Sequence, residues 1–240
     1  MKTANLAVAR QASRESVVLL KNDGHLLPLD AAAIKTIALS GPNADNPYYT
    51  LGHYRPGDVP VITVRQALEE RFKGKAQVLY SKGADFFDAK WPDTEIFHDP
   101  PAAAEQKLID EAAANARQAD IAIVVVGDQY NGVPGVRGTV GESASRTGIE
   151  LTGRQDDLIR AVVAAGKPTI VVDISGRPVA LNVAKRFAPA IVQAFLPWYY
   201  FKLSNLPHET ITIDLVNLAG EYDYRAPAYS VTKDTRPVYS

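Results

Sequence analysis

Apolar residues in this chain occur in short runs that alternate with segments of helical spacing. The run over residues 121–126 is apolar at every position, which is typical of an interior strand of a parallel sheet covered on both faces. Similar runs cover residues 34–39, 76–80, 170–174 and 190–195, and helical spacing covers residues 64–72, 102–119, 152 onward and 178–187. Strands that alternate with helices indicate βαβ units. The pattern predicts an α/β fold, a three-layer αβα sandwich with a mostly parallel, doubly wound sheet.

The two ends of the chain depart from this alternation. Residues 4–20 have amphipathic helical spacing, so residues 1–30 are predicted to form a linker helix and connector. Residues 31–200 hold the alternating elements and form the predicted sandwich domain. Residues 201–240 are rich in turn formers and tyrosine, and we expect them to form a divergent, extended tail.

Composition excludes several classes of function. The 240 residues carry a formal net charge of -1, which leaves no electrostatic footprint for nucleic acid or an anionic membrane. The absence of cysteine excludes disulfides, thiol nucleophiles and Cys-based metal sites, but leaves the compartment open. No segment approaches about 18 consecutive apolar residues, and the amino terminus has no apolar signal-peptide core. We therefore expect neither a membrane span nor an export signal in the sequence as written.

Rival motifs fail on spacing. Glycines recur every third residue in the loop after residues 121–126, but a dinucleotide fingerprint leads directly into a helix, and here about 25 residues intervene. The chain has no Walker A sequence and no nucleophile elbow. Its four histidines lack the close spacing of metal ligands. The sequence therefore predicts no cofactor and no metal.

The same loop carries a candidate catalytic carboxylate. Glu142 lies between the buried run and a helix whose sequence Thr152-x-x-Gln155 predicts a capping box. Ligands of open α/β sheets bind outside the carboxyl ends of the strands, so Glu142 is placed where a substrate could bind. Arg146 follows four residues later, and a solvated ion pair between the two would produce the same sequence. Position alone leaves both interpretations open.

The loop after residues 34–39 offers a second candidate group. His53 and Tyr54 follow a stretch dense in turn formers, and both residue types can bind sugar hydroxyls at a functional edge. A packed loop would contain the same residues. Asp45 and Asn46 lie within the turn-forming stretch, where an Asx turn that holds the loop is an equally good interpretation.

Several separated stretches, collinear over residues 9–200, carry a family resemblance. They are residues 9–22 with 26–29, Gly41-Pro42-Asn43-Ala44-Asp45, Leu51-Gly52-His53-Tyr54, Gly141-Glu142-Ser143 with Ser145-Arg146-Thr147, Leu151 and Gln155, Gly166-Lys167-Pro168, Gly176-Arg177-Pro178 and Leu196-Pro197-Trp198-Tyr199-Tyr200. Together they resemble the second domain of the family-three glycoside hydrolases, the β-glucosidase and β-xylosidase group. From Phe201 onward the sequence departs from the Pro-Gly and Glu-Gly-Gly segment typical of that family.

The resemblance implies a part in retaining hydrolysis of a β-linked oligosaccharide or glycoside. In that family a barrel aspartate is the nucleophile, and in many members a glutamate on a second-domain loop is the acid/base; the matching position is Glu142. A catalytic barrel is therefore expected upstream, and the isolated chain is expected to be inactive. Family members are often periplasmic or secreted.

The resemblance also implies a sugar-binding rim. Asp45, Asn46, His53 and Tyr54 would form this rim, with Tyr54 as a stacking face, and Arg146 would orient the loop that carries the acid/base. A second hypothesis, from another class, is a non-catalytic carbohydrate-binding or interaction module that keeps the fold without the barrel.

Overall fold

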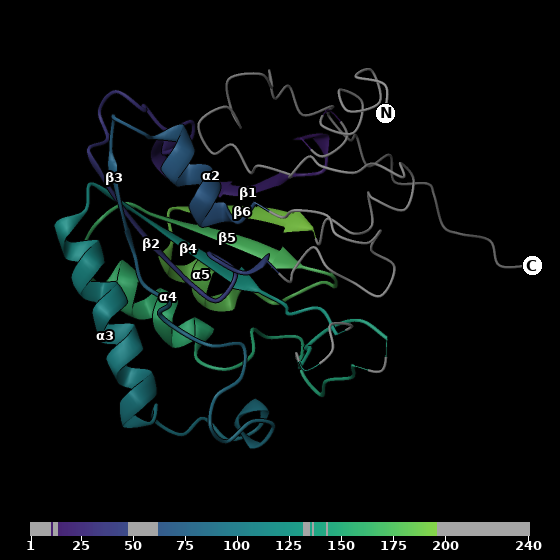
Figure 1. The fold of residues 1–240 in the computed structure, drawn as a ribbon. Helices are drawn as coiled ribbons and strands as arrows, with labels where there is room; N and C mark the ends of the chain where they lie inside the picture. The colour runs from purple at the N-terminus through teal and green to yellow at the C-terminus, as the bar shows by residue number, and fades with distance from the viewer. Residues whose placement is uncertain are drawn as a thin grey trace, which may run out of the picture.

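The computed structural model describes residues 11, 14–47, 62–131, 135, 137–142 and 144–195. The described strands are β1 (Val18–Asn22), β2 (Thr36–Ser40), β3 (Gln77–Tyr80), β4 (Ile121–Gly127), β5 (Thr169–Ser175) and β6 (Ala190–Phe195). The helices are α2 (Val64–Arg71), α3 (Ala103–Gln118), α4 (Gln155–Val163) and α5 (Asn182–Phe187), with short 3-10 helices at η1 (Asp23–His25) and η3 (Asp93–Glu95). Figure 1 shows these elements arranged around one central sheet.

The described strands form a single six-stranded sheet in the order β1-β6-β5-β4-β2-β3. The neighbours from β6 to β3 are all parallel, and only β1 runs antiparallel, along the outer edge of β6. The four apolar runs at 34–39, 121–126, 170–174 and 190–195 therefore lie side by side. The predicted mostly parallel α/β sheet is confirmed.

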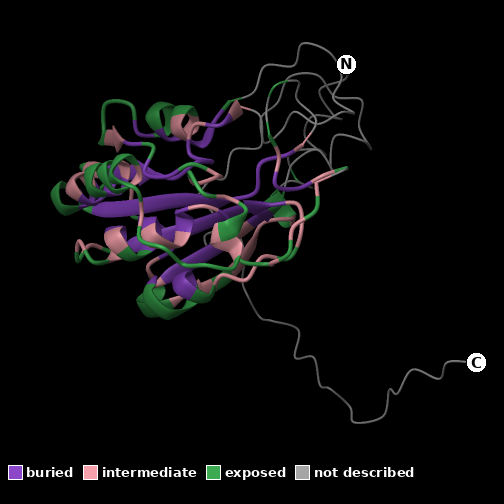
Figure 2. Ribbon diagram, turned by 90° about the horizontal axis from the view of Figure 1, so that it is seen from below, coloured by how far each residue is buried: buried purple, intermediate pink, exposed green. Residues whose placement is uncertain are grey.

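Helices cover both faces of the sheet (Figure 1). Alternate residues of β4 point to opposite faces, so Ile121, Ile123 and Val125 share a buried cluster with Val64 and Leu68 of α2. Ala122, Val124 and Val126 share the other cluster with residues of α3, α4 and α5. Figure 2 shows the resulting buried central layer between helices whose outer surfaces are exposed. The uninterrupted apolar sequence of β4 follows from this two-sided burial.

The amino-terminal segment corrects one prediction. The predicted helix over residues 4–20 does not extend to its end, because Val18 to Leu20 belong to β1. This strand pairs with β6 from Val18 opposite Gln193 to Asn22 opposite Ala190. Lys21 reinforces the edge, since its Nζ donates to the carbonyl oxygen of Ala188 at 2.7 Å. The end of the predicted linker therefore completes the sheet.

The chain reverses direction across the sheet between β2 and β4. From β2 it passes through α2 to β3 on one side, and then through α3 to β4 on the other side of β2. The carboxyl ends of β2 and β4 therefore flank a topological switch point, where ligands of doubly wound sheets bind. The loops that begin at Gly41 and Asp128 meet there, since Asn46 Nδ2 donates to Gln129 Oε1 at 2.9 Å.

The predicted extended tail at 201–240 lies outside the described residues, as does most of the predicted amino-terminal helix. Among the helices that the structure describes, none has the length and apolar character needed to cross a membrane.

Candidate active-site loop

The loop that carries Glu142 starts from a tightly packed strand end. Gly127, the last residue of β4, has φ +123°, and a Cβ atom there would lie 2.0 Å from the carbonyl oxygen of Ile174. Gln155 holds the same residue from the other end of the loop: its Oε1 accepts from Gly127 N at 2.8 Å, and its Nε2 donates to Gly127 O at 3.1 Å. The loop therefore begins and ends at one fixed point.

These contacts correct the predicted capping box. Helix α4 begins at Gln155 itself, and Arg154 occupies the N-cap position without a side-chain cap hydrogen bond. The Gln155 amide is committed to the end of β4 and to Thr152 O, at 3.0 Å. The sequence pattern was real, but its glutamine holds a neighbouring strand rather than the first turn of its own helix.

The neck of the loop is a short pair of backbone bridges. Asn131 N donates to Val140 O, and Thr139 N donates to Gln129 O, each at 2.7 Å. Tyr130 is buried beneath this neck with 1% exposure. Gly141 lies against its ring, because a Cβ atom at Gly141 would lie 2.9 Å from Tyr130 Cε2. The residue before Glu142 is therefore pressed onto a buried aromatic ring.

Glu142 itself is exposed at the end of this packed neck. Its carbonyl oxygen accepts a hydrogen bond of 2.8 Å from Asn131 Nδ2, so the backbone of Glu142 is fixed across the neck. The carboxylate is thus presented to solvent from an ordered backbone position at the switch-point edge of the sheet. This placement suits a group that must reach a substrate held by another part of a protein.

A buried charge cluster lies at the base of the loop. Asp128 is 1% exposed, and its Oδ1 accepts from Thr139 Oγ1 at 2.7 Å. Arg146 Nη1 lies 3.8 Å from Asp128 Oδ1, and Arg177 Nε lies 3.6 Å from Asp128 Oδ2. Arg177 also donates to Thr139 O. A single carboxylate therefore collects groups from three parts of the chain.

The structure places Arg146 inside the protein, with a side chain only 2% exposed. Its Nη2 donates to Glu150 O at 2.6 Å and to Gly148 O at 3.3 Å, which fixes the returning limb of the loop. Burial lowers the pKa of Arg146, whereas the neighbouring Asp128 carboxylate raises it. A side chain buried to this degree is not half of a solvated ion pair, so that alternative for Arg146 is wrong.

The segment before α3 holds the loop from outside. Glu95 Oε2 accepts from Thr147 Oγ1 at 2.5 Å, and Glu95 Oε1 lies 3.9 Å from Arg146 Nε. The Arg137 guanidinium lies 3.9 Å from the centroid of the Trp91 ring, a cation–π contact. Both limbs of the loop are thereby attached to a segment that the sequence showed only as irregular and aromatic.

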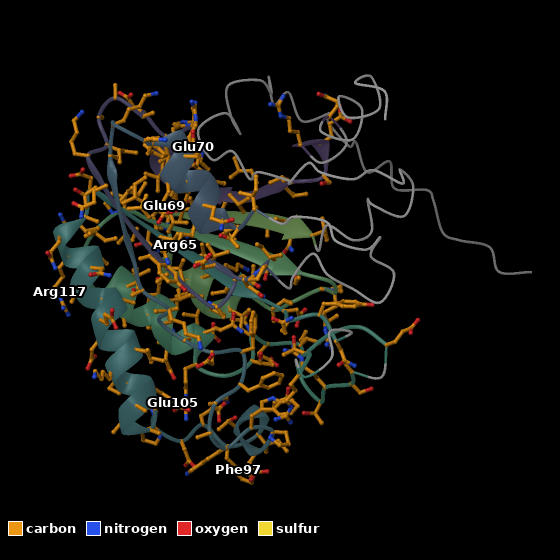
Figure 3. The ribbon with its side chains drawn as sticks, in the orientation of Figure 1. Arg65, Glu69, Glu70, Phe97, Glu105 and Arg117 are labelled. Carbon is orange, nitrogen blue, oxygen red and sulfur yellow. The ribbon has the colours of Figure 1, made fainter. Side chains whose placement is uncertain are left out.

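The candidate rim residues of the first loop are committed to internal contacts. Asp45 accepts from Thr63 Oγ1 at 2.7 Å and from Arg65 Nη1 at 3.2 Å, which ties the loop to the start of α2 (Arg65 is labelled in Figure 3). Asn46 is buried, and its Nδ2 donates to Asn43 Oδ1 at 3.0 Å and to Gln129 Oε1 at 2.9 Å. These contacts favour the loop-holding interpretation, with Thr63, Arg65 and Gln129 as partners from other segments. His53 and Tyr54 lie outside the described residues.

Sequence reasoning missed the residues that join the two loops. Asn43 Nδ2 donates to Val126 O at 3.1 Å and lies 3.3 Å from the carbonyl oxygens of Asp128 and Ile174, so it fills the switch point. Asp128 gave one usable signal, because it is a charged residue directly after a fully buried strand. Arg177 gave none, since its partner is distant in sequence.

A second buried carboxyl group lies nearby on β5. Asp173 is fully buried, and burial raises its pKa to about 7, with a further upward contribution from Asp128. Ser175 Oγ donates to Asp173 Oδ2 at 2.8 Å and partly offsets the shift. The folded protein therefore holds a proton here that an unfolded aspartate, with a pKa of about 3.9, would release.

This proton predicts a dependence of stability on pH. Between about pH 4 and pH 7 the folded state binds one more proton than the unfolded state at Asp173, so stability should fall as pH rises, by up to roughly 1 kcal/mol per pH unit. Asp173→Asn should flatten that decline, measured by urea unfolding at several pH values. Asp156, whose pKa burial raises to about 6, contributes in the same direction, so the difference between wild type and variant is the readout. Parallel curves for the two proteins would contradict the assignment.

Comparison with known proteins identifies the domain. Residues 17–199 match the model of the glycosyl hydrolase family 3 C-terminal domain. A periplasmic β-glucosidase of Salmonella typhimurium is 36% identical over 196 residues, which are 78% of this chain and 24% of that protein. A β-xylosidase of Formosa agariphila is 30% identical over 197 residues, 80% of this chain and 24% of the relative. The chain thus spans about a quarter of the length of these curated relatives.

The solved structures agree. The β-glucosidase EmGH1 of Erythrobacter marinus superposes with a TM-score of 0.64 at 31% identity, over 82% of this chain and 27% of that one. The residues matched by the family model, 17–199, include all six described strands and the loop that carries Glu142. The chain belongs to glycosyl hydrolase family 3, and it corresponds to the C-terminal domain of that family.

Proposed function

We propose that this domain supplies Glu142 as the acid/base carboxylate of a retaining β-glycosidase whose nucleophile belongs to a separate catalytic barrel. The observation that carries the proposal is an exposed carboxylate on a loop whose base is buried and cross-linked at the switch point. The relatives named β-glucosidase and β-xylosidase support a β-linked glucoside or xyloside as the substrate.

The chemistry explains why the carboxylate stands on a loop. In a retaining glycosidase the two carboxyl groups lie about 5 to 5.5 Å apart across the glycosidic bond. A carboxylate from a second domain must therefore extend to the mouth of the barrel, and its backbone must be fixed so that the distance is kept. The proton that it delivers goes to the departing oxygen, so its contribution is largest where the leaving group is poor.

The supporting roles follow from the contacts of the two loops. Arg146 orients the loop, since its guanidinium holds the limb that follows Glu142. His53 and Tyr54 form the sugar-binding rim, with Tyr54 as a stacking face. Asp45 and Asn46 contribute to this rim chiefly by fixing the loop from which it extends, because their side chains contact α2 and Gln129.

The proposal predicts that the isolated chain is inactive. The purified 240-residue protein should hydrolyse aryl β-glucosides and β-xylosides no faster than buffer, because one carboxylate supplies neither a nucleophile nor positioning of the sugar. Fusion behind a family 3 barrel should restore turnover, which Glu142→Gln should then abolish for unactivated substrates.

Two results would refute the proposal. The first is turnover by the isolated chain that Glu142→Gln abolishes, which would mean that this domain contains a complete site. The second is sugar binding without turnover by the barrel-bearing protein, which would favour a non-catalytic carbohydrate-binding module.

A further inference from the structure

The segment that carries Glu142 is held on both sides by one side chain. Thr139, three residues before Glu142, donates its hydroxyl hydrogen to Asp128 Oδ1 at 2.7 Å. Arg146, four residues after Glu142, places Nη1 3.8 Å from the same oxygen. The Asp128 carboxylate is therefore the common anchor of both flanks of the acid/base segment.

Asp128 is itself fixed to the sheet. Its backbone N–H donates to Ile174 O of β5 at 2.9 Å, directly after the end of β4. Thr139 Oγ1 also accepts from Gln129 N at 3.0 Å, so the hydroxyl is oriented from two sides. The position of Asp128 is therefore set by the sheet, and the position of the loop depends on its contacts with Asp128.

The cluster depends on charge more than on directional hydrogen bonds. Asp128 Oδ2, Arg146 Nε and Arg177 Nε are buried and have no hydrogen-bond partner among the described residues. The two guanidinium contacts of Asp128, at 3.8 and 3.6 Å, are ion pairs without hydrogen-bond geometry. Neutralising the carboxylate would remove the ion-pair partner of Arg177, whose side chain is 23% exposed, and would leave the buried Arg146 guanidinium with the more distant Glu95 carboxylate at 3.9 Å.

We propose that Asp128 is a positioning residue for proton transfer by Glu142: its buried carboxylate fixes Thr139 and Arg146, and through them the segment between. This inference rests on the proposed function of Glu142. A misplacement of about 1 Å far from the reacting atoms can cost roughly 10²-fold in rate, so a loosened anchor should impair proton delivery while the carboxylate of Glu142 remains present.

The test uses the protein with its catalytic barrel and two variants. Asp128→Asn removes the charge at nearly constant shape and should lower kcat/KM for substrates with poor leaving groups by about 10²-fold, with a much smaller loss of kcat/KM for activated aryl glycosides. Thr139→Val removes one hydroxyl contact and should lower kcat/KM in the same selective way, whereas Thr139→Ser, which keeps the hydroxyl, should restore it.

Glu105→Gln provides the matched control. Glu105 projects from α3 (Figure 3) and forms an ion pair with Arg154 Nε at 3.1 Å, without a contact to Asp128 or Thr139 among the described residues. Glu105→Gln also neutralises a carboxylate that is paired with an arginine, so it shows how far a general loss of stability alone would change the rates. This variant should change the rates of both substrate classes equally or not at all.

The decisive comparison repeats Asp128→Asn in a Glu142→Ala background. If Asp128 acts through Glu142, its removal should add no further leaving-group selectivity there. Equal effects of Asp128→Asn in both backgrounds, or equal losses with good and poor leaving groups, would overturn the inference and leave the proposed function intact. If Glu142→Ala alone shows no leaving-group selectivity, the proposed function itself has failed.

Discussion

Replacement of Glu142 by alanine, in a protein where a catalytic barrel precedes this domain, is expected to slow hydrolysis of substrates with poor leaving groups by roughly 10²–10⁴-fold. The kcat/KM of activated aryl glycosides should fall much less, because their leaving groups depart without a proton. Added azide should partly restore the breakdown of the glycosyl-enzyme intermediate, since azide attacks without general-base assistance. The measurement is steady-state kcat and kcat/KM over a series of leaving groups.

Glu150→Ala is the matched control for this prediction. Glu150 is a second exposed carboxylate on the same loop, and its Oε2 accepts from Ile149 N at 3.1 Å. Its removal should leave the leaving-group dependence unchanged. Equal losses for both substrate classes in Glu142→Ala, with no rescue by azide, would move the acid/base role to another residue.

Gly127→Ala is expected to destabilise the isolated domain by about 4 kcal/mol or more, at the upper end of what single substitutions do. The added methyl group would lie 2.0 Å from Ile174 O and 2.7 Å from Asp173 Oδ1, at a φ of +123° that L residues rarely adopt. Neither neighbour can move away, because Ile174 O belongs to the paired backbone of β5 and Asp173 is fully buried. Urea unfolding followed by circular dichroism measures the change.

Gly74→Ala distinguishes backbone strain at a positive φ from the steric clash of the added Cβ atom. Gly74 also has a positive φ, +70°, but a Cβ atom there would have no neighbour within 4 Å. Backbone strain alone should therefore cost about 1 kcal/mol. Similar losses in the two variants would show that the close approach of β4 and β5 at Gly127 is not the main constraint.

The parallel core could be predicted because its signal is local. Strand β4 is buried at every position, and its run of consecutive apolar residues follows directly from that burial. Strand β1 could not be recognised in the same way. Its residues lie in a segment with helical spacing, and its extended form is stabilised by pairing with β6, which is far away in the sequence. Tertiary pairing overrode a local preference.

The candidate site was predictable only in outline. The position of Glu142 after a buried strand placed it at the edge where the structure has it. The partners of Arg146 could not be inferred, because Asp128 and Glu95 belong to other segments of the chain. Glu142, four residues before Arg146, offered a simpler explanation as its ion-pair partner. The Gln155 amide shows the same limit, since its contact with Gly127 depends on how two elements pack.

The pairing of β1 with β6 has a consequence for synthesis on the ribosome. The first described strand to emerge finds its partner only after Ala190 to Phe195 have been made. Contacts of such long sequence separation form late, because the entropy of closing the intervening chain must be overcome first. We therefore expect the central strands of the nascent domain to pair before β1 does. Until β1 pairs with β6, the outer edge of β6 is open, and another chain could add a strand there.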